Sequence, residues 1–434
     1  MRDDPALKAF LKAHALDEHS IDMELHLQKF CREMDLVRSG KKSTDHTVKM
    51  IPSDLGVFAM PEKDTCVTVI DIGGTNVRSA VLTMGRQGIR IENRNSFLTP
   101  GITHDIDSEQ FFREIAEGVK NSLGAERISI CFSLAALPAP DRDAVVVAGG
   151  KQMRITDLIG KKVGAGFLSA MGKIGISGKK DITVINDTVA AALAGEGEAF
   201  RFRDHAYGGF MGFIYGTGTN LCYREPSGLM INVESGAYCG FPAGDLDDLY
   251  DAELIDAGED RFEKMVSGGY QGGLAEKILQ CAAAEGLLTR KTYQNIFPEN
   301  DKKKGLARQS RIDSRNISAF SQDPDGDGKI ARACCCGEDR ERLMGLFDAL
   351  TGRSARLCCI TITGALMHAG KKGQMHDPVW ITAEGSTYLK QKGFREALEA
   401  YMDEFARKRH GLSYEFHQTE DAVFKGIAAA CLSR

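Results

Sequence analysis

The sequence predicts an α/β fold in which one phosphate-binding unit occurs twice. Three observations support this prediction: a glycine-threonine turn between β-type runs in Val67–Thr83, a second such turn in Gly209–Glu225, and a short apolar run between them, Asp181–Thr188, that ends in an acid. In such turns the glycines let the backbone approach an anion, and N–H groups and the threonine hydroxyl donate hydrogen bonds to it. We therefore expect two hairpins that hold a nucleotide from both sides.

The first turn carries an acid at its entrance. Asp71 follows the apolar run and precedes Gly73, Gly74 and Thr75, and its carboxylate can orient hydrated Mg²⁺. The pattern GxxxxGK[ST] does not occur, so this is not a Walker loop. Alone, the motif could also be a plain hairpin turn. The second copy and the strand-end acid, Asp187, favour phosphate binding.

Length and composition set broad limits. With 434 residues, 43% of them apolar, the chain can bury two cores, so we expect two or three domains. The net charge is −5 and the densest basic run, Lys302–Lys304, follows Asp301, so we expect no nucleic-acid partner. The N-terminus lacks the apolar core of a signal peptide, and no run reaches the ~18 apolar residues of a membrane span. We therefore expect a soluble, cytoplasmic protein with no membrane partner; the oligomeric state stays unknown.

The twelve cysteines are not spaced as a disulfide framework. Cys334–Cys336 are contiguous, and Cys358 and Cys359 lie in an apolar run without a histidine at ligand spacing. We interpret nearly all as reduced thiols and assign no metal ligand, with zinc as the alternative. The segment Asp323–Ile330 resembles the start of a calcium loop, but its twelfth position is Cys334 rather than glutamate, which favours a solvated turn.

Periodicity predicts the remaining elements. Residues 5–38 predict two helices, in which Met23, Leu27, Phe30 and Met34 form one apolar stripe. The other expected elements, in chain order, are strands at 66–70, 77–83 and 128–132, a helix at 155–173, a strand at 181–186, a helix at 189–195, a helical block at 246–372, a strand at 379–382, a helix at 388–408, a strand at 412–416 and a helix at 421–432.

With both hairpins and Asn186-Asp187 in place, the chain resembles the eukaryotic-type hexokinase family from about residue 15 to its C-terminus. The segments that carry the resemblance are MIP at 50–52, CFS at 131–133, INVESGAY at 231–238, FEKMVSGGYQG at 262–272, SARLC at 354–358 and ITAEGSTY at 381–388. The resemblance implies two actin-like ATPase (ribonuclease H-like) domains around a central cleft. The small domain would comprise residues 66–188 plus 419–434, and the large one residues 1–65 plus 189–418.

The resemblance also implies an activity, the ATP-dependent phosphorylation of glucose or a related hexose at O6, with Mg²⁺ carried by ATP. It implies Asp187 as the base that accepts the proton of the 6-hydroxyl, and Lys151 near the sugar and the transferred phosphate. The implied sugar contacts are Ser133, Asn186, Asn220, Glu234 and Glu263. The implied nucleotide contacts are Asp71, Gly73, Gly74, Thr75, Asn76 and Arg78 in the first loop, Gly216, Thr217 and Gly218 in the second, and Gly385, Ser386 and Thr387 on the adenosine side.

Each assignment has a structural alternative when the family is set aside. Asp187 could cap the helix that follows it, and Ser133 could simply end a strand. Arg78 could be a charge on the face of a hairpin. Glu234 and Glu263 could be solvated surface acids.

Several family positions differ in this chain. The family's FSFP becomes Phe132–Ala135, WTKGF becomes Gly149–Met153 with Gly150 in place of a sugar-binding threonine, and the glycine loop GSGKGAA becomes Asp421–Gly426. These changes put the sugar's identity in question more than the chemistry. The alternatives are a kinase of mannose, fructose or glucosamine, and a non-catalytic sugar sensor of the same fold; an actin-like filament ATPase would leave Glu234 and Glu263 without a purpose.

Overall fold

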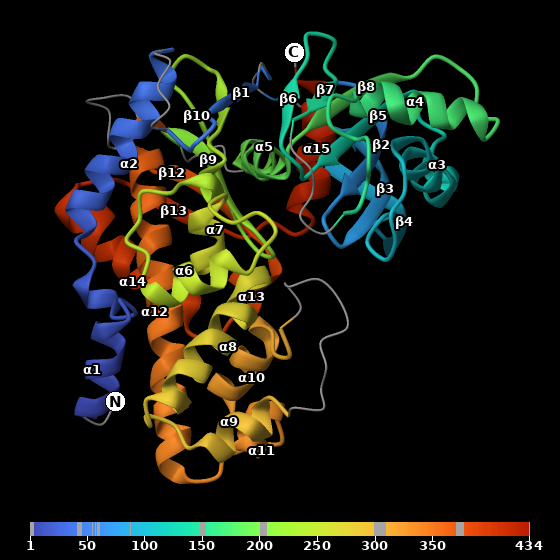
Figure 1. Cartoon of the computed structure of the whole chain (residues 1–434). Helices are drawn as coiled ribbons and strands as arrows, with labels where there is room; N and C mark the ends of the chain where they lie inside the picture. Colours follow the sequence, from blue (N-terminus) through green and yellow to red (C-terminus); the bar gives the residue numbers. More distant parts are fainter. Residues whose placement is uncertain are drawn as a thin grey trace.

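The computed structural model describes residues 4–40, 46–53, 55–56, 58, 61–86, 88–147, 153–199, 206–298, 310–369 and 377–433. Two mixed β-sheets lie in two lobes, with most of the helices gathered around one of them (Figure 1). The two sheets confirm the predicted α/β class.

The smaller lobe is built on a five-stranded sheet in the order β4-β3-β2-β5-β8. Its strands are β2 (Thr65–Ile72), β3 (Asn76–Gly85), β4 (Gly88–Leu98), β5 (Arg127–Phe132) and β8 (Asp181–Ile185). β2, β3 and β4 pair antiparallel, whereas β2, β5 and β8 run parallel. Helices α3 (Ser108–Gly118) and α4 (Val163–Lys173) share one hydrophobic cluster with the sheet, and α15 (Ala422–Leu432) shares another. A short hairpin, β6 (Ala136–Pro138) and β7 (Ala144–Val146), follows β5.

The larger lobe is built on a six-stranded sheet in the order β1-β11-β10-β9-β12-β13. Its strands are β1 (Ile51–Ser53), β9 (Gly209–Tyr215), β10 (Thr219–Arg224), β11 (Met230–Asn232), β12 (Val379–Glu384) and β13 (Tyr414–His417). Helices α2 (Met23–Arg38) and α12 (Gly337–Ala369) pack with this sheet in the largest hydrophobic cluster. The apolar stripe predicted around Phe30 is the buried face of α2.

A second cluster joins helices at the far end of the larger lobe (Figure 1). These helices are α1 (Pro5–Ala13), α6 (Asp245–Ala252), α8 (Gly268–Ala284), α9 (Arg290–Ile296), α10 (Ser314–Gln322), α11 (Lys329–Ala333) and the first half of α12; the short α7 (Arg261–Val266) precedes α8. The calcium-loop-like segment is a turn between α10 and α11, as predicted.

Two helices join the lobes. α5 (Asp187–Ala199) packs on β9, β10 and β12 of the larger sheet, whereas α15 packs on the smaller sheet, and the two helices contact each other between the sheets (Figure 1). Their crossing is close, because a Cβ on Gly426 of α15 would overlap the carbonyl oxygen of Ala190 in α5. Hydrophobic residues of both sheets, such as Val67 and Met230, meet in one cluster around this crossing. The predicted domain boundaries stay a prediction.

Two predicted helices differ from the structure. The helix expected at 388–408 is three segments: α13 (Ser386–Lys390), α14 (Phe394–Tyr401) and a π-helical turn, Met402–Arg409. Gly393, at a φ of 80°, separates the first two. The helix expected at 155–173 begins only at Val163. No helix in the described ranges has an apolar stretch long enough to cross a membrane.

Candidate active site

The first glycine turn joins β2 to β3. The N–H of Gly73 donates to the carbonyl of Asn76 (3.0 Å), which closes the turn. Thr99 holds it from outside: its hydroxyl donates to the carbonyl of Gly73 (2.7 Å) and its N–H to the carbonyl of Thr75 (3.0 Å). Gly74 is half-buried, and the side chains of Thr75 and Asn76 are exposed. The turn is thus fixed through its carbonyls while its threonine faces solvent.

Asp71 stands at the end of β2, directly opposite Arg78 on β3. The guanidinium of Arg78 donates to one oxygen of this carboxylate, Oδ2, from Nε (2.9 Å) and from Nη2 (2.5 Å). Asp71 is buried, whereas half of the Arg78 side chain is exposed. The arginine therefore compensates part of the buried charge and still presents a cationic edge.

The second glycine turn joins β9 to β10 in the other sheet. The N–H of Gly216 donates to the carbonyl of Gly218 (2.8 Å), and the first N–H groups of α8, from Gly268 and Gly269, donate to the carbonyls of Gly216 (2.9 Å) and Thr217 (3.0 Å). Hydrogen bonds to its carbonyls thus fix this turn too.

The predicted adenosine-side loop packs directly on the second turn. The hydroxyl of Thr387 donates to the carbonyl of Gly216 (2.9 Å). Gly385 has a φ of 119°, and a Cβ there would overlap the carbonyl of Tyr215. Ser386, between them, is exposed. Only glycine fits at position 385, because both the backbone angle and the close approach exclude a side chain.

Asp187 lies between the two lobes, in the first turn of α5. Asn186 is the capping residue of that helix, since its Oδ1 accepts the N–H of Thr188 (2.9 Å). Asp187 Oδ1 accepts the same N–H (2.8 Å). Burial raises the pKa of Asp187 to about 7, and the negative charges of Asp71 and Glu234 add to the shift. One acid from each lobe thus contributes to the raised pKa of Asp187.

Two predicted sugar contacts of the larger lobe, Asn220 and Glu234, belong to one hydrogen-bonded group. Glu234 Oε1 accepts from the side-chain amides of Asn220 (3.1 Å) and Asn232 (2.6 Å). Its backbone is left-handed, with a φ of 54°, an unusual conformation for glutamate. Burial raises the pKa of Glu234, and the cation of Lys49 opposes that shift. Asn232 and Lys49 were not predicted; Asn232 ends β11, next to the edge strand β1, and Lys49 lies in the segment before β1.

Glu263 lies against the second glycine turn. Its Oε2 accepts the N–H of Thr219 (3.1 Å), and a Cβ on Gly218 would overlap this carboxylate. Glu263 belongs to α7, which is only six residues long, so it needs support from its neighbours.

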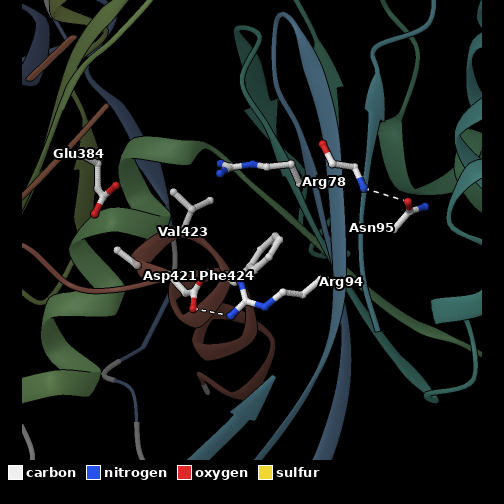
Figure 2. A pocket seen from close by; sticks show the side chains of 9 residues that line it. Arg78, Arg94, Asn95, Glu384, Asp421, Val423 and Phe424 are labelled. Carbon is white, nitrogen blue, oxygen red and sulfur yellow. Dashed lines mark hydrogen bonds and ion pairs between the residues drawn. The ribbon is translucent and has the colours of Figure 1, made fainter. Parts of the chain in front are cut away.

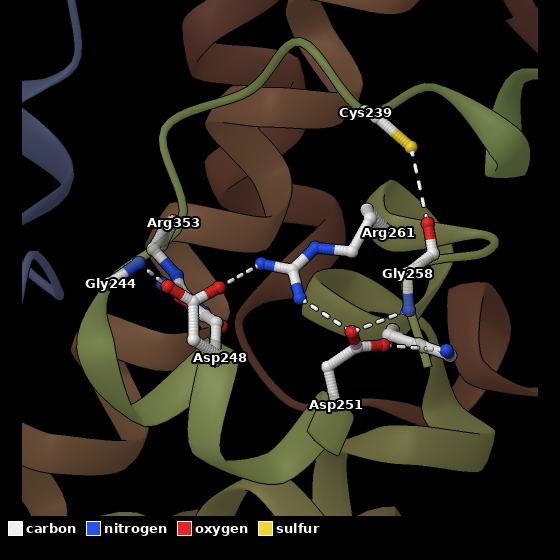
Figure 3. Close-up of polar contacts among 9 residues, drawn as sticks. Cys239, Gly244, Asp248, Asp251, Gly258, Arg261 and Arg353 are labelled. Carbon is white, nitrogen blue, oxygen red and sulfur yellow. Dashed lines mark hydrogen bonds and ion pairs between the residues drawn. The ribbon is translucent and has the colours of Figure 1, made fainter. Parts of the chain in front are cut away.

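Polar contacts to α6 supply that support (Figure 3). Lys264 Nζ binds Asp251 (2.6 Å), and Arg261 binds Asp251 (2.8 Å) and Asp248. Figure 3 also shows Arg353 of α12, which pairs with the buried Asp247 at 2.7 and 2.8 Å. These ion pairs fix α7, and with it Glu263, to the helical part of the larger lobe.

A pocket of about 410 Å³ opens between the two sheets (Figure 2). Its lining residues are Arg78, Arg94, Asn95, Ser96, Glu384, Asp421, Ala422, Val423 and Phe424. Arg94 forms a two-pronged ion pair with Asp421 (2.6 Å), and the Arg78 guanidinium lies 5.7 Å from the centre of the Phe424 ring.

Glu384, at the end of β12, faces Arg78 across the pocket (Figure 2). Burial raises its pKa to about 7, although Arg78 opposes the shift. Glu384 and Arg94 were missed from the sequence; the one available signal was that Glu384 directly precedes the predicted Gly385 loop.

Ser133 is the remaining predicted sugar contact that the structure describes. Ser133 follows β5, is half-buried, and donates its N–H to the carbonyl of Ile72 (3.2 Å). A cavity of about 130 Å³ beside it is lined by Leu134, Asn186 and Asn232, among others. Lys151 and Gly150 lie outside the described residues.

Comparisons with known proteins agree with this architecture. Two models of the hexokinase family match the chain, over residues 6–196 and 210–433. Human Hexokinase-2 is 26% identical over 439 residues, which is 92% of this chain and 45% of that protein; the chain thus spans about half its length. Hexokinase-7 of rice (Oryza sativa subsp. japonica) is 25% identical, over 89% of this chain and 88% of the plant protein.

Solved structures show the same fold. A hexokinase from Schistosoma mansoni complexed with glucose matches over the full length of both chains, with a TM-score of 0.79 at 21% identity. A second hexokinase crystal structure covers 99% of this chain and all of its own, with a TM-score of 0.71 at 20% identity.

Proposed function

Because the chain belongs to the hexokinase family, we propose that it transfers the terminal phosphoryl group of ATP to the 6-hydroxyl of a hexose, glucose or a close relative. The observation that carries this proposal is the position of Asp187: its carboxyl has a pKa of about 7, and the charges of Asp71 in one lobe and Glu234 in the other contribute to that value. A base with a pKa near the working pH can accept a proton efficiently.

In this mechanism Asp187 orients the attacking hydroxyl and takes its proton as the oxygen bonds to phosphorus. Phosphoryl transfer passes through a loose transition state, so positioning and charge neutralisation do most of the work. We assign phosphate binding to the two turns, one from each sheet, through backbone N–H groups and the hydroxyls of Thr75 and Thr217. Asp71, which Arg78 binds at one oxygen, would hold the hydrated Mg²⁺ carried by the nucleotide, and that ion would supply neutralisation of the phosphate charge.

The sugar side supports a polyol substrate. Asn220 is hydrogen-bonded to Glu234, and the charge of Glu263 acts on Glu234. Asn186 lines a cavity together with Asn232. Such amides and carboxylates suit a hexose, which presents a ring of hydroxyl groups. A sugar whose hydroxyls do not match leaves a buried polar group unpaired, which such sites reject strongly. We include Ser133 and Lys151 among the sugar-side residues on the strength of the family resemblance.

The test is an ADP-release assay with Mg-ATP and a panel of glucose, mannose, fructose, glucosamine and N-acetylglucosamine. Asp187→Asn keeps the shape of the side chain and removes the base, so we expect kcat to fall by about 10²–10⁴ while calorimetric sugar binding changes little. Asp181→Asn, at the exposed start of the strand that precedes α5, is the matched control and should match the wild-type rate.

The outcomes separate the alternatives. Turnover that Asp187→Asn retains would refute the assignment of the base. Preference for another sugar in the panel would replace glucose as the substrate. Sugar binding without turnover on any of them would favour the non-catalytic sensor.

A further inference from the structure

Away from the proposed active site, three potential metal ligands converge where α1 meets α8. His14 follows the last residue of α1, while Cys281 and Glu285 lie one turn apart at the end of α8. In the sequence, His14 lies 271 positions before Glu285, to which it is hydrogen-bonded. Among the described residues this is the one group of three such side chains whose ligand atoms all lie within 4.8 Å of one another.

The distances fit a tetrahedral ion. His14 Nε2 lies 3.1 Å from Glu285 Oε1 and 3.7 Å from Cys281 Sγ, and the sulfur lies 3.4 Å from the same carboxylate oxygen. Zinc bonds of about 2.0–2.2 Å to nitrogen and oxygen and about 2.3 Å to sulfur place tetrahedral ligand atoms about 3.4–3.6 Å apart. The three atoms already form one face of such a tetrahedron.

The histidine is held as a ligand requires. Both oxygens of Asp245, the first residue of α6, lie within 3.0 Å of His14 Nδ1, and the Phe10 ring packs on the imidazole at 4.4 Å. A carboxylate on one ring nitrogen fixes the tautomer and leaves the other nitrogen for a metal. Asp245 and Glu285 are each about half exposed, whereas the His14 side chain is 10% exposed, so solvent can reach the open side.

The charges also favour a cation. Two carboxylates and a thiol surround a single imidazole here. A divalent ion would bind the Cys281 thiolate and release the thiol proton to solvent.

We propose that His14, Cys281 and Glu285 form a Zn²⁺ site, with a solvent oxygen as the fourth ligand and Asp245 orienting the histidine. One nitrogen, one sulfur and one oxygen ligand suit zinc better than magnesium or calcium, which prefer oxygen alone. These residues are widely separated in the sequence, which by itself predicts no metal ligand.

The proposed Zn²⁺ site has a structural role, because it links three helices. It ties the end of α1 to α6 and to α8, whose opposite end holds the second glycine turn. α8 has 17 residues, which corresponds to about 25 Å, so the ion lies far from the proposed chemistry. Zinc should therefore raise the thermal midpoint of unfolding and leave kcat unchanged.

The test uses the full chain stripped with a chelator and then titrated with Zn²⁺ against a chromophoric competitor. We expect one tightly held equivalent in the wild type and at least a tenfold loss of affinity in Cys281→Ser. Cys336→Ser changes an exposed thiol outside the group and should bind zinc as the wild type does. Added Zn²⁺ should raise the unfolding midpoint of the wild type and of Cys336→Ser, but not that of Cys281→Ser.

Cobalt gives a readout that needs no variant. Co²⁺ bound to the wild type should produce a thiolate-to-cobalt charge-transfer band, because Cys281 is a ligand. The proposal is overturned if the wild type takes up no zinc, if Cys281→Ser binds it equally well, if Cys336→Ser loses it, or if the cobalt complex lacks the thiolate band. In those cases His14 serves as an ion-pair partner of Asp245 and Glu285.

Discussion

At the residue scale, the ionised carboxylate of Asp187 lowers the stability of the fold but is the form that can act as a base. Its pKa rises from 3.8 to about 7 in the folded chain, so between these pH values the folded state holds a proton that the unfolded state has lost. Stability must therefore fall as pH rises from about 4 to 7. The difference of about three units corresponds to at most about 4 kcal/mol.

Asp187→Asn should therefore have opposite effects on folding and on turnover. The variant should unfold at a higher temperature than the wild type at pH 8, and this gap should narrow towards pH 4. Wild-type kcat/KM should fall below about pH 7, where the base becomes protonated. Thermal unfolding and initial rates across this range check both expectations. An equal gap at every pH would contradict the proposed pKa; Asp181→Asn should show no gap.

Glu384 leads to a second prediction at this scale. It faces the pocket with a pKa of about 7, so it is neutral below that pH and repels a triphosphate above it. We expect the KM for ATP to rise as the pH passes 7. Glu384→Gln should remove that rise and lower KM two- to fivefold at pH 8, about 1 kcal/mol or less, because the carboxylate at the pocket is partly screened by solvent. Glu92→Gln, on an exposed position of β4, serves as the control. A KM that is unchanged in Glu384→Gln would place the nucleotide elsewhere.

At the scale of elements, the sequence predicted those features that a few neighbouring residues determine. Both glycine turns and the strand before Asp187 were found because glycine, threonine and a short apolar run are visible in a few residues. The break at Gly393, within the helix expected at 388–408, was not predicted because the apolar spacing on either side hides it. β4 was missed because most of its side chains are exposed, so it lacks the alternation of a half-buried strand.

The lining of the pocket is not visible in any local sequence pattern. Arg94 on β4 and Glu384 on β12 lie far apart in the sequence and meet only because the two sheets face each other. The three proposed zinc ligands are likewise brought together only by the fold, because His14 lies far from the other two in the sequence. For Lys151 the assignment still rests on the family resemblance alone.

The crossing of α5 and α15 gives the prediction at this scale. Gly426→Ala would place a methyl group on the carbonyl of Ala190, and such overpacking costs about 1–3 kcal/mol. Gly172→Ala in α4, where a Cβ meets nothing within 4 Å, should be neutral or stabilising by up to about 1 kcal/mol. Denaturant unfolding of both variants measures the contrast. Equal free energies of unfolding would mean that the helices separate easily.

At the scale of the whole molecule, the proposed site is divided between the lobes. The first turn and Ser133 belong to the smaller sheet, the second turn and Glu234 to the larger one, and Asp187 lies between them. The lobes are joined through α5, α15 and the hydrophobic cluster around their crossing. A ligand that contacts both sides can therefore draw them together and exclude water from the transferred phosphoryl group.

We expect a saturating hexose to reduce the radius of gyration measured by small-angle X-ray scattering. Asp187→Asn should show the same reduction, because it keeps the sugar contacts and removes only the base. Glu234→Gln alters the acid that receives two amide hydrogen bonds, so it should need a higher sugar concentration for the same change. If the radius stays constant while calorimetry shows that the sugar is bound, the two lobes are a rigid pair, and the exclusion of water must come from side chains already in place around Asp187.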